Sequence, residues 1–307
     1  MIYTCTLNPS LDYYMELDEV KLGDVNRCQN EYFVAGGKGI NVSIVLNNLK
    51  IQSRALGFVG GFVKNYFIEQ LQQYEYIQPC FTYIEDCTRI NVKMLSTQET
   101  DLNAKGPKVT EKEKTQMLHR VQRMNAIDIL VLSGSCPPNC FDMAEEMMKS
   151  CREIGCRIVL DCKPETMKKF LKYHPLLVKP NLKELEEMAG KKMESLDEII
   201  AYGKSLVKEG AENCLISLGA MGALLINQEG VYRSSISSGD VISTTGAGDS
   251  VVAGFLWNYQ RSRDIQTIFR YASACGSATA LSKGLATREK VEEVVKEIKV
   301  EKLEGEF

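Results

Sequence analysis

The 307-residue chain is 44% hydrophobic and 25% charged, and 37 Lys and Arg against 40 Asp and Glu give a formal net charge of −3. This is the composition of an ordinary globular protein with enough chain to bury a large core. The charge balance excludes a general nucleic-acid or anionic-membrane surface. No apolar run approaches about 18 residues, so we expect no transmembrane helix, and the first residues lack the pattern of a secretory signal.

The eleven cysteines are scattered along the chain, their number is odd, and no two form a CxxC pair. A chain of this size does not need disulfides for stability, so we expect reduced thiols and a cytoplasmic protein. The paired short spacings of a zinc site are also missing.

The first hundred residues contain two stretches that alternate polar and apolar residues, at 11–34 and 81–103. Both are rich in Tyr, Val, Ile and Thr and carry turn residues between their apolar runs. This pattern predicts antiparallel strands that leave the main sheet and form a small β lid.

From about residue 126, short apolar runs alternate with amphipathic segments. Strands are expected at 127–134, 156–162, 175–181 and 213–219, and helices at 141–155, 164–173, 182–190 and 195–210. Ser195 followed by Glu198 predicts a capping box at the start of the last helix. The alternation indicates a parallel sheet covered on both faces, with ligands bound beyond the carboxyl ends of the strands.

The segment "STTGAGDS" (243–250) places two glycines and Asp249 before a helix-compatible apolar run. Gly246 and Gly248 let successive N–H groups point at one spot, which favours an anion-binding site at a helix N-terminus. A carboxylate beside such a site suits a base next to a developing phosphoryl charge. The alternative is a glycine-rich turn in which Asp249 only caps the helix. No GK[ST] follows, so the segment is not a Walker A loop, and Val251 stands where a dinucleotide fingerprint needs glycine.

A second glycine cluster, "AGGKGIN" (35–41), also leads into a helix-like run. Lys38 sits among three glycines, so a ligand could approach the backbone closely while the lysine adds positive charge. The alternative is a tight strand-to-helix turn that carries a solvated lysine.

Together the two clusters resemble the paired signatures of the ribokinase-like (PfkB) carbohydrate kinases. The resemblance extends over nearly the whole chain, through "TLNPSLD" (6–12), "TRIN" (88–91), "LSGSCPP" (132–138), "KPNLKELE" (179–186) and "SLGAMGA" (217–223). It implies one domain over residues 1–307, a three-layer α/β/α sandwich with a mainly parallel central sheet and a small β-sheet lid. It also implies a homodimer formed through the lid.

The resemblance assigns the reacting groups. Asp249 corresponds to the family's catalytic base, and its anion hole for the transferring phosphate is matched by Gly246, Ala247 and Gly248. Asn181 and Glu184 match the family's NxxE element and would orient Mg²⁺ and its waters. The alternative for this pair is an ordinary acidic helix face.

The sugar side of the site is implied to comprise Asp12, Gly37, Lys38, Asn41, Arg89, Arg27 and Ser135. Arg89 and Lys38 are the main candidates for a cationic clamp on the sugar phosphate, because Arg suits bidentate phosphate contacts. Arg27 and Ser135 are weaker candidates. Arg89 as an exposed strand charge is the alternative.

The ATP side is implied to comprise Ser217, Gly219, Gly222, Lys179, Gly248, Ala274 and Ala278. The two alanines belong to a small-residue helix, 272–281, that would lie flat against adenine. Tight packing of this helix in the core is the alternative.

Within the family, the motifs are most similar to the 1-phosphofructokinase branch. They imply ATP- and Mg²⁺-dependent phosphorylation of D-fructose 1-phosphate at its C6 hydroxyl, giving D-fructose 1,6-bisphosphate. Tagatose-6-phosphate kinase and 6-phosphofructokinase activities remain alternatives, as does a non-catalytic sensor of sugar phosphate or nucleotide. Lys163, in "DCKPE" (161–165), receives no role.

Overall fold

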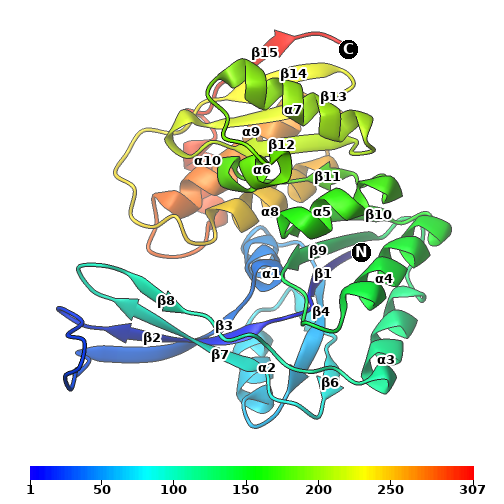
Figure 1. Cartoon of the computed structure of the whole chain (residues 1–307). Helices are drawn as coiled ribbons and strands as arrows, with labels where there is room; N and C mark the ends of the chain where they lie inside the picture. The colour runs from blue at the N-terminus through cyan, green and yellow to red at the C-terminus, as the bar shows by residue number, and fades with distance from the viewer.

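The computed structural model describes all 307 residues and contains two β-sheets (Figure 1). The large sheet has the order β15-β14-β13-β12-β11-β10-β9-β1-β4-β5, and β6 also pairs with β4. Its parallel strands are β1 (Ile2–Thr6), β4 (Ser53–Gly60), β5 (Ile77–Pro79), β6 (Thr82–Ile84), β9 (Ile129–Gly134), β10 (Arg157–Cys162), β11 (Leu177–Val178) and β12 (Asn213–Ser217). An antiparallel extension adds β13 (Ala223–Asn227), β14 (Gly230–Ser234) and β15 (Val300–Glu304).

Helices cover both faces of this sheet, because its strands bury side chains on both sides. In β9, Leu130 and Leu132 join one core, whereas Ile129 and Val131 join the other. The first core is closed by α3 (Glu111–Val121), α4 (Phe141–Ile154), α5 (Pro164–Phe170), α6 (Leu182–Ala189) and α7 (Leu196–Lys208). The second is closed by α1 (Lys38–Asn48), α8 (Ala247–Tyr259), α9 (Ile265–Ala280) and α10 (Arg288–Val294). A smaller cluster packs under α2 (Lys64–Gln72), and the three-layer sandwich is confirmed.

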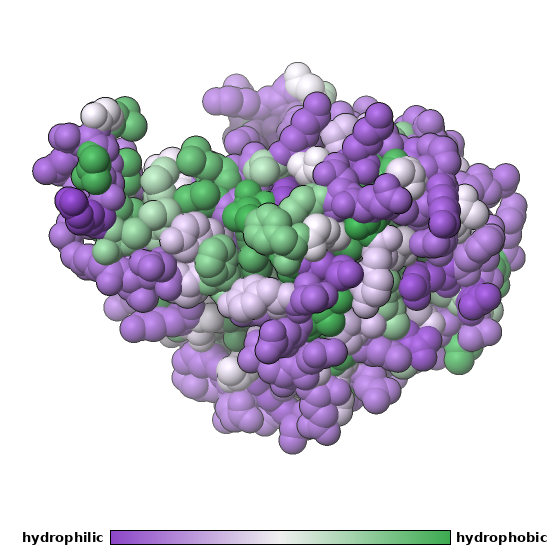
Figure 2. All heavy atoms as spheres, turned by 90° about the horizontal axis from the view of Figure 1, so that it is seen from below, coloured by the Kyte–Doolittle hydropathy of each residue, from purple (hydrophilic) through white to green (hydrophobic).

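The lid is a separate sheet of order β3-β2-β7-β8 that projects from one side of the body (Figure 1). It consists of β2 (Ser10–Glu16), β3 (Asn30–Gly36), β7 (Arg89–Leu95) and β8 (Thr100–Leu102). Figure 2 shows a hollow between the lid and the body in which hydrophobic side chains gather.

The lid differs from the prediction in two respects. Its central strands β2 and β7 run parallel, with Ser10 opposite Arg89 and Glu16 opposite Leu95, although we predicted only antiparallel pairs. Each of these strands begins a hairpin that leaves the body in the same direction, so the two hairpins meet side by side. In addition, the predicted lid segment 81–103 includes β6, which pairs with β4 in the large sheet.

Most predicted elements of the second half form, with local exceptions. The strand expected at 175–181 forms a ladder only over Leu177–Val178, since Pro175 and Pro180 flank it and lack N–H groups. The capping box at Ser195 is half formed: Ser195 Oγ accepts from the Glu198 N–H at 3.2 Å, but the Glu198 carboxylate accepts from the Glu194 N–H.

All eleven cysteines are free thiols. None of the helices has the length and apolar character needed to span a bilayer.

Candidate active site

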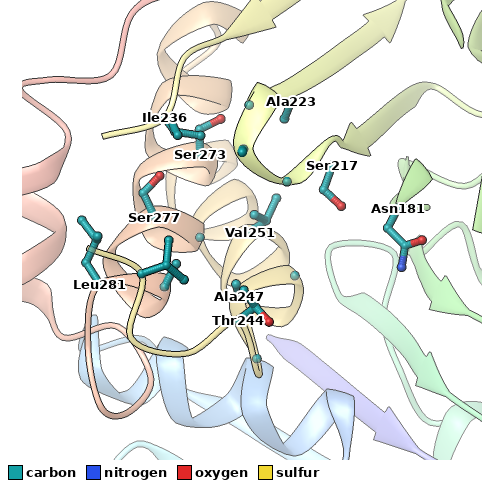
Figure 3. A pocket seen from close by; sticks show the side chains of 18 of the residues that line it. Asn181, Ser217, Ala223, Ile236, Thr244, Ala247, Val251, Ser273, Ser277 and Leu281 are labelled. Carbon is teal, nitrogen blue, oxygen red and sulfur yellow. The ribbon is translucent and has the colours of Figure 1, made fainter. Parts of the chain in front are cut away.

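The carboxyl ends of the central strands meet the N-termini of α1 and α8 at a cavity of about 790 Å³. Figure 3 shows its walls: Ser273 and Ser277 project from α9 on one side, and Ser217 and Asn181 lie across the cavity. Thr244 and Ala247, at the start of α8, lie between them. The carboxyl ends of the strands thus lie along one rim of the sheet, where ligand binding was predicted, and both glycine clusters reach this rim.

The start of α8 is shaped by its glycines. Gly246 is the N-cap and has a φ of 77°, a left-handed conformation that favours glycine. A Cβ at Gly248 would lie 3.1 Å from Lys179 Nζ, so glycine allows that ammonium to approach the backbone. The first intrahelical bond runs from the Ser250 N–H to the Gly246 carbonyl at 2.9 Å. The Ala247 N–H already meets the Thr244 carbonyl at 3.2 Å, so the amides of Gly248 and Asp249 are the ones available to an anion.

Asp249 is 5% exposed and its side chain accepts a 2.7 Å hydrogen bond from Asn41 Nδ2. Burial, reinforced by the nearby Asp161 carboxylate, raises the pKa of Asp249 to about 7. Asn41, expected to bind sugar hydroxyls, thus also orients the carboxylate. A buried carboxylate that titrates near neutrality is suited to act as a general base.

Asp161 is a site residue that the sequence reasoning did not identify. It is the last residue but one of β10, is fully buried, and its Oδ1 lies 3.0 Å from Lys38 Nζ and 3.4 Å from Lys179 Nζ. Burial alone would raise the pKa of Asp161, but the ammonium groups of Lys179 and Lys38 hold it below its usual value. Its Oδ2 is buried without a hydrogen-bond partner. The sequence signal that could have identified Asp161 is a carboxylate near the end of a buried strand, at the edge of the sheet where ligands were expected to bind.

Lys38 lines both the large cavity and a smaller pocket that contains Ser135, another of the sugar-side candidates. Its ammonium contacts Asp161 and, at 3.4 Å, Glu184 Oε1. Burial would lower the pKa of Lys38, but these two carboxylates raise it above its usual value, so the side chain stays charged. Lys38 and Lys179 form a cationic pair, because both ammonium groups contact Asp161 Oδ1, close to the start of α8. The hydrogen bonds of Arg89 go instead to the carbonyls of Asn8 and Ala104.

Asn181 and Glu184 form a reciprocal capping box at the start of α6. The Glu184 N–H donates to Asn181 Oδ1 at 2.8 Å, and the Asn181 N–H donates to Glu184 Oε2 at 2.9 Å. Only Glu184 Oε1 points to the cationic pair. No cluster of three His, Cys, Asp or Glu side chains is arranged to hold a metal.

The sugar-side candidates gather at the base of the lid. Asp12 Oδ1 accepts hydrogen bonds from Ser10 Oγ at 2.7 Å and Asn91 Nδ2 at 2.8 Å. Arg89 is half-buried and donates to the Asn8 carbonyl at 3.0 Å, and Asn8 Nδ2 lies 3.3 Å from Ser135 Oγ.

Gly37 and Arg27 complete the sugar-side candidates. Gly37 is the N-cap of α1, with a φ of 133°, directly before Lys38. Arg27 is exposed on the connection between β2 and β3, and its side chain contacts none of the other candidates.

On the nucleotide side, five of the seven expected residues line the cavity: Ser217, Gly219, Gly222, Lys179 and Gly248. Ala274 and Ala278 do not, because they are fully buried in the core beneath α9. The neighbouring face of α9 supplies the wall instead, through Ser273, Gly276, Ser277 and Ala280. No sequence pattern predicted that the loop from Ser235 to Thr245 also lines the cavity, where Ile236 lies beside Ser273 of α9 (Figure 3).

Comparisons with known proteins agree with this geometry. A model of the pfkB family carbohydrate kinases matches residues 6–291. A 1-phosphofructokinase of Bacillus subtilis is 40% identical, covering 99% of this chain and 100% of the relative. A D-tagatose-1-phosphate kinase of Bacillus licheniformis is 36% identical, with coverages of 98% and 99%. The structure of phosphofructokinase-2 from Escherichia coli in complex with fructose-6-phosphate has a TM-score of 0.90 at 26% identity, covering 96% of this chain and 98% of that one. The chain belongs to the pfkB family of carbohydrate kinases.

Proposed function

We propose that this kinase transfers the γ-phosphoryl group of ATP to the C6 hydroxyl of D-fructose 1-phosphate, giving D-fructose 1,6-bisphosphate and ADP. The observation that carries the proposal is the buried Asp249 at the amide-rich start of α8, beside the Lys38–Asp161–Lys179 cluster. The 40% identity to a 1-phosphofructokinase over the full chain supports this choice of sugar.

Asp249 accepts the proton of the C6 hydroxyl as its oxygen attacks the phosphorus. Asn41 holds the carboxylate in place through its 2.7 Å hydrogen bond. The transition state of phosphoryl transfer is loose, so positioning and neutralisation of charge contribute more than nucleophile strength. The amides at the start of α8 supply fixed positive potential where negative charge develops.

Lys38 and Lys179 place two ammonium groups beside that position. Asp161 lies between them and fixes both, so the pair is ordered before substrate arrives. The cavity along Ser217, Gly222 and the outer face of α9 accommodates the rest of the nucleotide.

The residues present fit Mg²⁺ in the way that nucleotide-binding proteins usually hold it, through few protein oxygens, several waters and substrate phosphates. Two oxygens are the least engaged: the unpartnered Asp161 Oδ2, and Glu184 Oε1, whose one contact is with Lys38 Nζ at 3.4 Å. Capping engages Asn181 Oδ1 and Glu184 Oε2. Mg²⁺, when bound, neutralises charge on the β- and γ-phosphates.

The 1-phosphate end is assigned to Arg89, with Ser135 nearby. Lys38 is left out of this clamp because two carboxylates already engage it. Arg27 is left out because it is exposed and distant along the lid. Asp12, at the base of the lid, is positioned to bind sugar hydroxyls, so lid closure would couple sugar capture to exclusion of water.

D-Tagatose 1-phosphate is a second candidate acceptor, because relatives at 36% and 31% identity carry the name D-tagatose-1-phosphate kinase. The two sugars differ only in configuration at C4 and present the same C6 hydroxyl and terminal phosphate.

A coupled ADP-release assay with Mg·ATP would compare fructose 1-phosphate, tagatose 1-phosphate, fructose 6-phosphate and tagatose 6-phosphate. We expect the highest kcat/KM with fructose 1-phosphate. A higher value with another acceptor would overturn the assigned specificity, and no turnover with any of them would favour a sensor.

We also propose that the kinase is a cytoplasmic homodimer that pairs through its lid. Four apolar side chains of this sheet are 36–55% exposed, Tyr32 and Val34 on one face and Phe33 and Leu102 on the other, an unusual cost for an isolated surface. A second copy packed against the sheet would remove part of this apolar area from water. The free state of all eleven thiols fits a reducing compartment.

A further inference from the structure

A chain of buried hydrogen bonds ends on the N-cap of α8. Ser250 and Thr279 are 0% and 1% exposed, and their hydroxyl oxygens lie 2.6 Å apart. Ser250 Oγ is 2.9 Å from the Gly246 carbonyl oxygen. At the other end, the Ala286 N–H donates to Thr279 Oγ1 at 2.9 Å.

The direction of every bond in this chain is fixed by chemistry. A carbonyl only accepts and an amide N–H only donates, whereas each hydroxyl has a single proton. Ser250 therefore donates to Gly246, Thr279 donates to Ser250, and Thr279 accepts from Ala286. Each group has its partner, and reversing any one bond would leave a buried donor or acceptor unpaired.

Gly246, on which this relay of hydrogen bonds from Ala286 through Thr279 and Ser250 ends, needs to be restrained in one backbone conformation. Gly246 has more conformational freedom than any other residue type would have at this position, yet its carbonyl orients the first turn of α8. The Ser250 hydroxyl adds a second bond to the carbonyl that already accepts from the Ser250 N–H. Leu285 fills the space beside Gly246 in which a Cβ would lie.

The other end of the relay reaches the helix that follows the first glycine cluster. Asn48, in the last turn of α1, donates from Nδ2 to the Ala286 carbonyl at 3.0 Å. Asn41, in the first turn of α1, donates to Asp249. Both ends of α1 are thus tied to the first turn of α8, one directly and one through the relay.

We propose that Ser250 and Thr279 are positioning residues for phosphoryl transfer, which lock the start of α8 in one orientation without touching substrate. This inference rests on the proposed function. Dipoles stabilise a transition state most when they are already oriented, since no reorganisation is then needed during reaction. A relay of this kind acts on kcat, because it improves contacts to developing charge rather than to bound substrate.

The test uses Thr279→Val, which keeps the shape of the side chain but removes the proton donated to Ser250. We expect kcat to fall about 10- to 100-fold, the order of effect that a small misplacement produces, with the KM values of ATP and sugar phosphate nearly unchanged. Thr279→Ser, which keeps the hydroxyl, should restore kcat.

Thr4→Val is the matched control. It breaks a similar buried relay, Thr4–Ser43–Ser53, with oxygen distances of 2.7 and 2.9 Å. This relay joins α1, through Ser43, to β1 and β4 and does not reach the start of α8. It should lower the melting temperature but leave kcat unchanged.

Amide hydrogen exchange over residues 244–250 provides a readout independent of turnover, and should accelerate in Thr279→Val but not in Thr4→Val. Normal kcat in Thr279→Val, equal kcat losses in both variants, or unchanged exchange over 244–250 would each overturn the inference. If the wild-type protein phosphorylates none of the sugars, the proposed function fails, while the exchange comparison still decides whether the relay orders this turn.

Discussion

Two carboxylates of the site share a buried setting but have opposite electrostatic environments. Asp161 lies against two ammonium groups and stays ionised, whereas Asp249 has one amide donor, is buried, and faces the charge of Asp161. Their pKa values move apart for this reason. The separation supports the proposed roles, with Asp161 as a permanent anion that organises cations and Asp249 as the group that exchanges a proton.

Asp249→Asn should reduce kcat by about 10²- to 10⁴-fold, the usual contribution of a general base. The amide keeps the size of the side chain, so binding of Mg·ATP, followed by calorimetry, should stay close to wild type. Turnover near the wild-type rate would contradict the assignment of the base.

The pH dependence follows from the raised pKa of Asp249. Only the deprotonated form accepts a proton, so kcat/KM should decline as pH falls through about 7. Asp161→Asn removes the repelling charge, which lowers the pKa of Asp249 and should move the acidic limb of the profile to lower pH. The same variant should also be less active at pH values above the acidic limb, because Lys38 and Lys179 lose the carboxylate that both of them contact. An acidic limb that stays in place would show that Asp161 does not act on Asp249.

Arg89→Ala should raise the KM of the sugar phosphate by about 10- to 100-fold, in line with loss of charge-assisted hydrogen bonds, with little effect on the KM of ATP. Lys93→Ala is a suitable control, since Lys93 lies on the same strand and pairs with Asp101 in the lid. Steady-state kinetics with each substrate varied would separate the two. Equal effects in both variants would mean that only the general charge of the lid matters.

At the scale of elements, α9 shows what periodicity can and cannot predict. Its small residues were recognised in the sequence, but the cavity-facing residues were not. Ala274 and Ala278 and the pair Ser273 and Ser277 follow the same spacing of four, one residue out of step. Both pairs consist of small residues, so composition does not show which pair faces the cavity. The packing of α9 against α8 decides this.

This difference between faces can be tested with two neighbouring substitutions. Ser277→Leu should narrow the cavity and raise the KM of ATP about tenfold or more, while the melting temperature changes little. Ala278→Leu should instead lower stability by about 1–3 kcal/mol, as expected for overpacking a filled core. Steady-state kinetics and thermal denaturation of both variants provide the comparison. If Ala278→Leu raised the KM of ATP and Ser277→Leu lowered stability, the face of α9 that carries Ala274 and Ala278 would be the one against the nucleotide.

Elements that obey local rules were predictable, and those that depend on distant partners were not. The helix over 141–155 stops at Gly155, whose φ of 85° ends it as its sequence position suggests. The parallel pairing of β2 with β7 joins segments almost 80 residues apart, and no local pattern encodes its direction. The site shows the same division. Asp249 and Lys38 belong to sequence motifs and could be predicted, whereas Asp161 is recognised as part of the site only because Lys38 of α1 and Lys179, just after β11, contact it.

At the scale of the whole molecule, the exposed apolar side chains of the lid bear on assembly. Sedimentation velocity should show a dimer at micromolar concentration, and Phe33→Asp should shift it toward monomer. Phe33 stacks on Tyr13 at 4.4 Å within the lid, so circular dichroism must confirm that the variant remains folded. A monomeric wild-type protein would exclude pairing through the lid.

The shared direction of β2 and β7 also bears on how the enzyme exchanges its sugar. Both strands are attached at the same end, and Asp12 and Arg89 sit within three residues of that attachment. When such a sheet swings, its tip travels far while its pivot hardly moves. Asp12 and Arg89 are therefore close to the axis of any such motion. In the proposed function, the mouth of the site would open widely to release a bisphosphate, while Asp12 and Arg89 would keep their places for the next acceptor.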